Sequence, residues 1–198
     1  MAAAELPELL LPDAPAWRKW LVANHDDSAG VWLVLHKKGG TVTDLTYDDA
    51  LDEALCFGWI DGQVHKRDDG SYRQRFTPRR TKSPWSARNV SHVSRLLEAG
   101  LMTPAGQAAV DAAKADGRWE QAYAPQSTAE MPADLMAAIA AVPAAQSMYD
   151  VLNSANRFAL YYRVNEAKRP ATRASRIEQF VAMLARGETP HPQPKRPT

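Results

Sequence analysis

The sequence predicts an α+β fold, in which a small antiparallel sheet packs with helices in the N-terminal half and the C-terminal half is all helical. β-rich runs bounded by turn residues occur at about 31–38, 59–66 and 72–78, and none follows. Beyond residue 83, apolar residues recur with helical spacing between segments marked by Pro and Gly. Because strands and helices are segregated along the chain, the pattern favours this class over an alternating parallel sheet.

The first three elements are predicted to be a helix, a strand and a second helix. Residues 14–24 carry apolar side chains at i, i+3 and i+4, which is typical of an amphipathic helix. Residues 31–38 (VWLVLHKK) form a β-rich run that ends at a pair of glycines. Thr46 is a suitable N-cap for a helix over 47–57, whose acidic first turn suits the helix dipole and which Gly58 ends.

A hairpin is predicted from two β-type runs joined through Asp68-Asp69-Gly70. A three-residue loop sets the register that keeps apolar residues of both strands on one face. The residues that this register directs into the core are Ile60, Val64, Tyr72 and Phe76. The residues that it directs to the outward face are Trp59, Asp61, Gln63, His65, Arg73, Arg75, Thr77 and Arg79. The pairs that it predicts are Asp61 with Arg79, His65 with Arg75, and Val64 with Phe76.

Proline residues mark the helices of the second half. Ser83-Pro84 is expected to open a helix that ends near residue 99, and Thr103-Pro104 one over 104–116. The remaining helices are expected at about 132–141, 144–152, 155–168 and 171–186.

These elements suggest three segments. Residues 1–100 are predicted to form the α+β domain, and residues 101–187 a helical extension packed on it. The final stretch GETPHPQPKRPT contains four prolines, so residues 188–198 are expected to be disordered.

Composition and charge narrow the class of protein. A single cysteine, Cys56, excludes an intramolecular disulfide and a cysteine-based zinc cluster. The N-terminus lacks the basic region of a signal peptide and no run reaches ~20 apolar residues, so a cytoplasmic protein without membrane insertion is expected. The net charge is only +1, yet residues 1–63 hold four basic and eleven acidic side chains, while 64–95 hold nine basic and two acidic.

The sequence signatures of common enzymes are missing. There is no GxSxG, HExxH, P-loop or GxGxxG motif, and the five histidines lack ligand spacing. We therefore predict no catalytic residue, no metal and no cofactor, and the pattern disfavours the familiar enzyme classes while leaving an unfamiliar one open.

The strongest indication of a binding site is the basic, aromatic stretch Leu55–Asn89. Arginine forks recognise planar anions, and aromatic faces stack on flat ligands or cations. The residues predicted to line a ligand-binding groove are Trp59, Asp61, His65, Arg73, Arg75, Arg79, Arg80, Trp85, Ser86 and Asn89. The alternative is structural: Asp61 and Arg79 form a cross-strand ion pair, the tryptophans belong to the core, and Ser86 caps a helix.

Several motifs resemble those of a known family. The runs TYDDALDEALCFGWIDG, YRQRFTPRRTKSPWSARN, AKADGRW and AKRPATRASRIEQFVAMLARGE resemble the YdeI/OmpD-associated family of bacterial proteins, over about 17–187. The resemblance implies a link to tolerance of antimicrobial peptides and bacteriocins, and no accepted catalytic residues. It also implies an N-terminal part related to the YjbR/CyaY-like α+β superfamily. Frataxin-like relatives bind iron through an acidic helix, to which Asp48, Asp49, Asp52 and Glu53 would correspond.

Three functions follow as hypotheses. The first is a cytoplasmic binding protein for an anionic or aromatic small molecule or a peptide, acting in antimicrobial or stress tolerance. The second is a nucleic-acid-binding protein, which interleaved basic and aromatic residues favour and the near-neutral net charge disfavours. The third is an unrecognised enzyme for a small anionic substrate, with Asp61 and His65 as acid and base.

Overall fold

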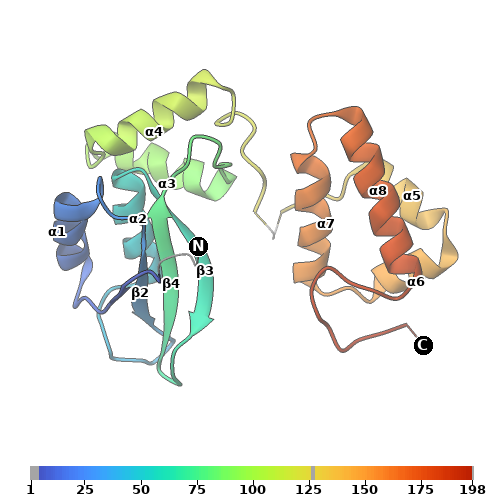
Figure 1. The fold of residues 1–198 in the computed structure, drawn as a ribbon, viewed down its shortest axis with the longest axis horizontal. Coiled ribbons are helices and arrows are strands. Elements are labelled where there is room, and N and C mark those ends of the chain that lie inside the picture. Colours follow the sequence, from blue (N-terminus) through green and yellow to red (C-terminus); the bar gives the residue numbers. More distant parts are fainter. Residues whose placement is uncertain (1–4, 126–127, 198) are drawn as a thin grey trace. The chain divides into compact units, whose positions relative to one another are not determined.

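The computed structural model describes residues 5–125 and 128–197 and confirms the predicted fold class (Figure 1). Contacts between residues divide the chain into two compact units, Met1–Ala122 and Tyr123–Thr198. Among the described residues, the first unit holds a four-stranded sheet with four helices, and the second holds four helices. The helix over Pro104–Ala115 thus lies in the first unit, whereas the sequence places it in the helical extension.

The sheet has the strand order β1-β2-β4-β3. Its strands are β1 (Glu8–Leu9), β2 (Val31–His36), β3 (Trp59–Lys66) and β4 (Ser71–Pro78). The three longer strands are the predicted ones, and they pair antiparallel. The two-residue β1 pairs parallel with β2 and was not predicted, because two residues carry no readable alternation.

Four helices cover one side of this sheet, each begun by a side-chain cap. They are α1 (Ala14–Asn24), α2 (Tyr47–Cys56), α3 (Ala87–Glu98) and α4 (Pro104–Ala115), with Asp13, Thr46, Ser86 and Thr103 as N-caps. Their apolar faces share one core with alternate strand residues, notably Val31, Leu33, Leu35, Trp59 and Phe76. One of the two tryptophans of α1 links this helix to α2, because Trp17 Nε1 donates to the Ala50 carbonyl at 3.1 Å.

The start of α3 differs from the prediction. The cap is Ser86, whose hydroxyl accepts from Asn89 N–H at 3.1 Å, and not Ser83. Ser83 instead closes a turn, where its hydroxyl accepts from Arg80 N–H at 3.0 Å. Trp85 is only 2% exposed and anchors this connection in the core, so the chain stays extended past Pro84 before the helix begins.

Helix α4 is fastened to the end of α2 through one carbonyl group. The Cys56 carbonyl accepts from both the N–H and the hydroxyl of Thr103, at 3.1 and 2.7 Å. Gly106 passes so close that a Cβ there would lie 2.2 Å from the same oxygen. Val110 and Ala113 of α4 are fully buried in the first unit's core. These contacts with α2 and with the core explain why α4 belongs to the first unit.

The second unit is a helical bundle with its own core. Its helices are α5 (Ala133–Ala140), α6 (Pro143–Asp150), α7 (Ser154–Glu166) and α8 (Pro170–Ala185), close to the predicted spans. The buried residues at its centre include Leu135, Ile139, Met148, Leu160, Val164, Phe180 and Leu184. In the part of the chain that the structure describes, no helix has the length and hydropathy needed to cross a membrane.

The proline-rich segment after α8 adopts a defined path, in contrast to the predicted disorder; of its residues, 198 lies outside the described part. Gln193 is 7% exposed, and Asn156 of α7 exchanges hydrogen bonds with the His191 backbone. Composition alone favours disorder because it offers little apolar surface to bury, but here buried side-chain amides supply the contacts.

Candidate functional site

The side chains of β4 alternate between the core and the opposite side of the sheet. Tyr72, Gln74 and Phe76 point to the helices, so Arg73 and Arg75 point away from them. Trp32 of β2 pairs with Arg75, and His65 of β3 pairs with Arg73, which places both on the arginine side. None of these residues belongs to the core shared with α1–α4. We call Trp32, His65, Arg73 and Arg75 the outer face.

Two rings on the outer face form a stack. The centroids of Trp32 and His65 lie 4.3 Å apart, with planes inclined by 28°. The Arg73 guanidinium carbon lies 5.7 Å from the Trp32 ring. The outer face therefore combines aromatic surface with positive charge.

The two arginines of the outer face differ in their partners. Arg73 forms an ion pair with Glu8 at 3.2 Å, and the same carboxylate pairs with Arg67 at 3.0 Å. Arg75 reaches only the neutral Gln63 Oε1, at 3.4 Å, and within the described residues it has no carboxylate partner. The buried Nε atoms of Arg73 and Arg75 have no hydrogen-bond partner in the described structure. The outer face thus has an excess of positive charge, centred on Arg75.

The predicted hairpin register is wrong. Asp61 pairs with Phe76 and not with Arg79, and His65 pairs with Arg73 and not with Arg75. The register shifts between Asp61 and Val64, where β3 contains a β-bulge. Gln74, which is 2% exposed, stabilises the bulge by donating to the Gly62 carbonyl at 2.9 Å.

Because of this shift, Trp59 and Asp61 lie on the opposite side of the sheet from that predicted. Trp59 is 1% exposed in the core, with Nε1 donating to the His25 carbonyl at 3.2 Å. Val64, expected in the core, pairs with Gln74 on the predicted side of the sheet but is 60% exposed there. Asp61 accepts from the Tyr47 hydroxyl at 2.7 Å. Burial, with the Asp61 charge adding to it, raises the pKa of Tyr47 well above its usual range. The bulge thus separates Asp61 from His65, so the proposed acid–base pair does not form.

A second group of predicted residues shapes the connection from β4 to α3. The Arg79 guanidinium lies over Trp85, 3.5 Å from the ring centroid, and Nη1 donates to the Pro84 carbonyl at 3.2 Å. Ser86 and Asn89 are mostly buried and form the helix cap. Arg80 is exposed. Arg79 thus contacts Trp85, and Ser86 contacts Asn89, and both contacts stabilise the connection from β4 to α3.

Three of the acidic side chains of α2 form ion pairs with basic residues of neighbouring helices. Asp48 pairs with Arg88, Asp52 with His92 and Arg95, and Glu53 with Arg18. Asp49 accepts from the Thr46 hydroxyl at 2.5 Å. No group of three or more potential metal ligands occurs among the described residues. The ion pairs link α2 to α1 and α3.

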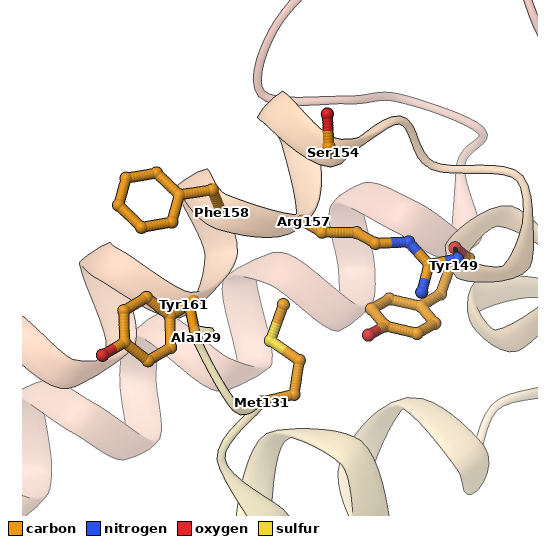
Figure 2. A pocket seen from close by; sticks show the side chains of 7 residues that line it. All are labelled: Ala129, Met131, Tyr149, Ser154, Arg157, Phe158 and Tyr161. Carbon is orange, nitrogen blue, oxygen red and sulfur yellow. Dashed lines mark hydrogen bonds between the residues drawn. The ribbon is translucent and has the colours of Figure 1, made fainter. Parts of the chain in front are cut away.

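The second unit contains a pocket that sequence reasoning missed (Figure 2). Its volume is about 200 Å³, and its lining residues are Ala129, Met131, Tyr149, Ser154, Arg157, Phe158 and Tyr161. Arg157 extends towards Tyr149, whose ring centroid lies 4.6 Å from the guanidinium carbon. The Arg157 guanidinium donates to the carbonyls of Tyr149 and Asp150 at the end of α6 and of Leu152 just beyond it. The aromatic spacing of Phe158 and Tyr161 was the only available sequence signal.

Comparison with family models assigns the two parts of the chain. Residues 9–109, just over half of the chain, match the family described as Domain of unknown function (DUF8412). The chain belongs to this family. Residues 128–187 match the family described as Bacteriocin-protection, YdeI or OmpD-Associated (OmdA). No curated protein and no solved structure matches the chain.

The two family matches follow the two structural units. The DUF8412 match contains all four outer-face residues, and the OmdA match contains the pocket lining. The predicted YdeI/OmpD-associated resemblance is thus confirmed for the helical unit. The relation of the N-terminal part to the YjbR/CyaY-like superfamily stays a prediction.

Proposed function

We propose that this chain is a binding protein that acts in bacteriocin protection and holds a planar anionic small molecule on the outer face of its DUF8412 part. The OmdA match supports the biological process, because the description of that family names bacteriocin protection. The contacts around Arg75 support the ligand chemistry.

The proposal rests mainly on the unsatisfied guanidinium group of Arg75. Its Nε is buried without a hydrogen-bond partner in the described structure, and its Nη1 donates to the neutral Gln63 Oε1 at 3.4 Å. A partly buried guanidinium without an anion is costly, and a bidentate oxyanion would satisfy it. Arg73 already has Glu8, so an anion would gain most at Arg75.

The aromatic pair beside Arg75 suggests that the ligand is flat. Trp32 lies opposite Arg75 in the register and stacks with His65. Aromatic side chains favour offset stacking on planar groups, typically with about 0.5–1.5 kcal/mol per pair. A planar group joined to a phosphate or carboxylate would use both features.

Nucleic acid is the second candidate, since stacking and arginine contacts also serve single strands. The net charge of +1 and the Glu8 carboxylate on this face disfavour a long polyanion. Binding measurements with ligands of different length and at different salt concentrations distinguish the two candidates. A protein that makes several phosphate contacts loses affinity steeply as the salt concentration rises.

Calorimetric titration tests the proposal with two probes, adenosine monophosphate and an oligothymidylate of about twelve nucleotides. We expect the mononucleotide to bind wild type and Arg75→Gln to weaken that binding about tenfold. Arg80→Gln is the matched control, because it removes the same charge from an exposed arginine. Undetectable mononucleotide binding, or equal loss in both variants, would overturn the proposal. Oligonucleotide binding that falls steeply with salt would replace it with the second candidate.

A cellular experiment tests the process. A strain lacking the gene should become more sensitive to a bacteriocin, and the Arg80→Gln chain should restore tolerance while Arg75→Gln restores less. Unchanged sensitivity of the deletion strain would remove the protective role and leave the binding measurement standing.

A further inference from the structure

Two buried side-chain amides join the proline-rich segment to the OmdA unit. Asn156 of α7 is fully buried and Gln193 is 7% exposed. Buried amides need partners for both their donors and their acceptors. These two find them in each other, with Asn156 Nδ2 donating to Gln193 Oε1 at 2.8 Å, and in nearby backbone.

Besides the Gln193 side chain, Asn156 binds the backbone of the segment at His191. Its Oδ1 accepts from His191 N–H at 2.7 Å, and its Nδ2 donates to the His191 carbonyl at 3.1 Å. A neighbouring β-strand engages a residue through the same two backbone groups. Recognition of this kind selects an extended chain whatever the side chain at that position.

Gln193 is the only side chain of the segment held in this way among the described residues. Its Oε1 accepts from Asn153 N–H at 3.1 Å, and its Nε2 donates to the Val151 carbonyl at 3.2 Å. One donor and one acceptor of the bundle backbone therefore match the two ends of a primary amide. Glutamate would set a carboxylate oxygen against the Val151 carbonyl, and alanine would leave both groups without this partner.

Prolines flank this glutamine on both sides, at positions 192 and 194. Proline restricts φ and has no N–H, so a Pro-Gln-Pro run is partly ordered before it docks and brings no unpaired donors from its prolines. Short extended peptides that bind protein surfaces gain affinity from this loss of flexibility in the free state.

The docking residues and their occupant lie in different parts of the chain. Val151, Asn153 and Asn156 lie within the OmdA match, whereas the segment begins just after that match ends at residue 187. The receiving surface is thus part of the family domain, and the segment that fills it is an addition to that domain.

We propose that Val151, Asn153 and Asn156 form a peptide-recognition site for an extended, proline-flanked glutamine segment of a partner protein. The chain's own residues 189–196 occupy this site in cis and compete with that partner. The proposal goes beyond the proposed function, because it concerns the other unit and a different class of ligand.

Binding of a labelled peptide to the full chain tests this site. The probe is a fluorescein-labelled synthetic peptide with the sequence of residues 187–197, GETPHPQPKRP, and its control carries alanine in place of glutamine. In the Gln193→Ala chain the internal anchor is lost, so anisotropy should show the probe binding at least about tenfold more tightly than the control peptide. Wild type should bind the probe more weakly, since a tethered segment competes at an effective concentration near the millimolar range.

Two further variants keep the test decisive. Adding Asn156→Ala to Gln193→Ala should abolish probe binding. His191→Pro removes the backbone donor of the segment without changing the receiving residues, and should also release the site if Gln193→Ala proves unstable.

Equal binding of both peptides, equal binding by wild type and Gln193→Ala, or no binding by either released chain would overturn the proposal. A wild-type dimer that Gln193→Ala dissociates in light scattering would also overturn it, because the occupant would then be a second copy.

Discussion

Trp32 and His65 stack across β4, with ring centroids 4.3 Å apart. They belong to β2 and β3, which both neighbour β4 and not each other. The two rings therefore bridge the strand that carries Arg73 and Arg75, and the Arg73 guanidinium carbon lies 5.7 Å from the Trp32 ring.

The ring bridge should contribute to stability. We expect His65→Ala to lower the free energy of unfolding by about 0.5–1.5 kcal/mol, because it removes one ring of the stack. Urea denaturation measures the change. Lys66, the next residue on the same strand, pairs with an exposed carboxylate at 3.6 Å, so Lys66→Ala should cost less than about 0.5 kcal/mol. Equal losses in the two variants would show that the stack adds nothing.

The bulge in β3 should depend on Gln74. Replacing it with leucine keeps the size of the side chain but leaves the Gly62 carbonyl without its donor, so we expect a loss of about 1–3 kcal/mol. Gln63→Leu is the matched control at the same bulge, where the side chain is exposed and the loss should stay within about 0.5 kcal/mol. A Gln74→Leu chain as stable as wild type would contradict this role.

The two serines before α3 should differ in importance. Ser86→Ala removes the helix cap and should cost about 1 kcal/mol in urea denaturation. Ser83→Ala removes a hydrogen bond in an exposed turn and should cost less than about 0.5 kcal/mol. The reverse order would indicate that the helix begins three residues earlier.

Cys56 should make stability fall in alkaline solution. Burial, with the nearby Glu53 carboxylate adding to it, raises the pKa of this thiol from 9.0 to about 11. A folded-state pKa above the unfolded value means that the thiol's contribution is complete below about pH 9 and is lost as pH rises towards 11. The urea midpoint of wild type should thus fall more steeply over this range than that of Cys56→Ala, which controls for other titrating groups. Parallel curves would refute the linkage.

The sequence predicted the fold class and most helices because their signals are local. Thr46, Thr103 and Pro143 mark helix starts where the structure has them. The face on which Trp59 lies could not be predicted, because the bulge reverses the faces of the β3 residues that precede it, and the bulge depends on a buried Gln74 twelve residues beyond Gly62. Gly62 within a strand was the one local hint of a bulge.

The candidate site was predicted only in part. His65, Arg73 and Arg75 gather on the outer face, but Trp32, which completes it, lies on a strand distant in sequence. The aromatic partner of Arg79 is Trp85, in a short connection whose path no periodicity describes. Contacts between residues far apart in the sequence therefore determine which residues of the basic stretch lie on the outer face.

The attachment of α4 to the Cys56 carbonyl bears on how the two parts can be produced separately. The DUF8412 match ends at residue 109, in the middle of α4 and before Val110 and Ala113, which are fully buried. A polypeptide cut there would lose part of its hydrophobic interior and leave half a helix behind. Expression of the N-terminal unit alone should therefore extend to Ala122, where the compact unit ends.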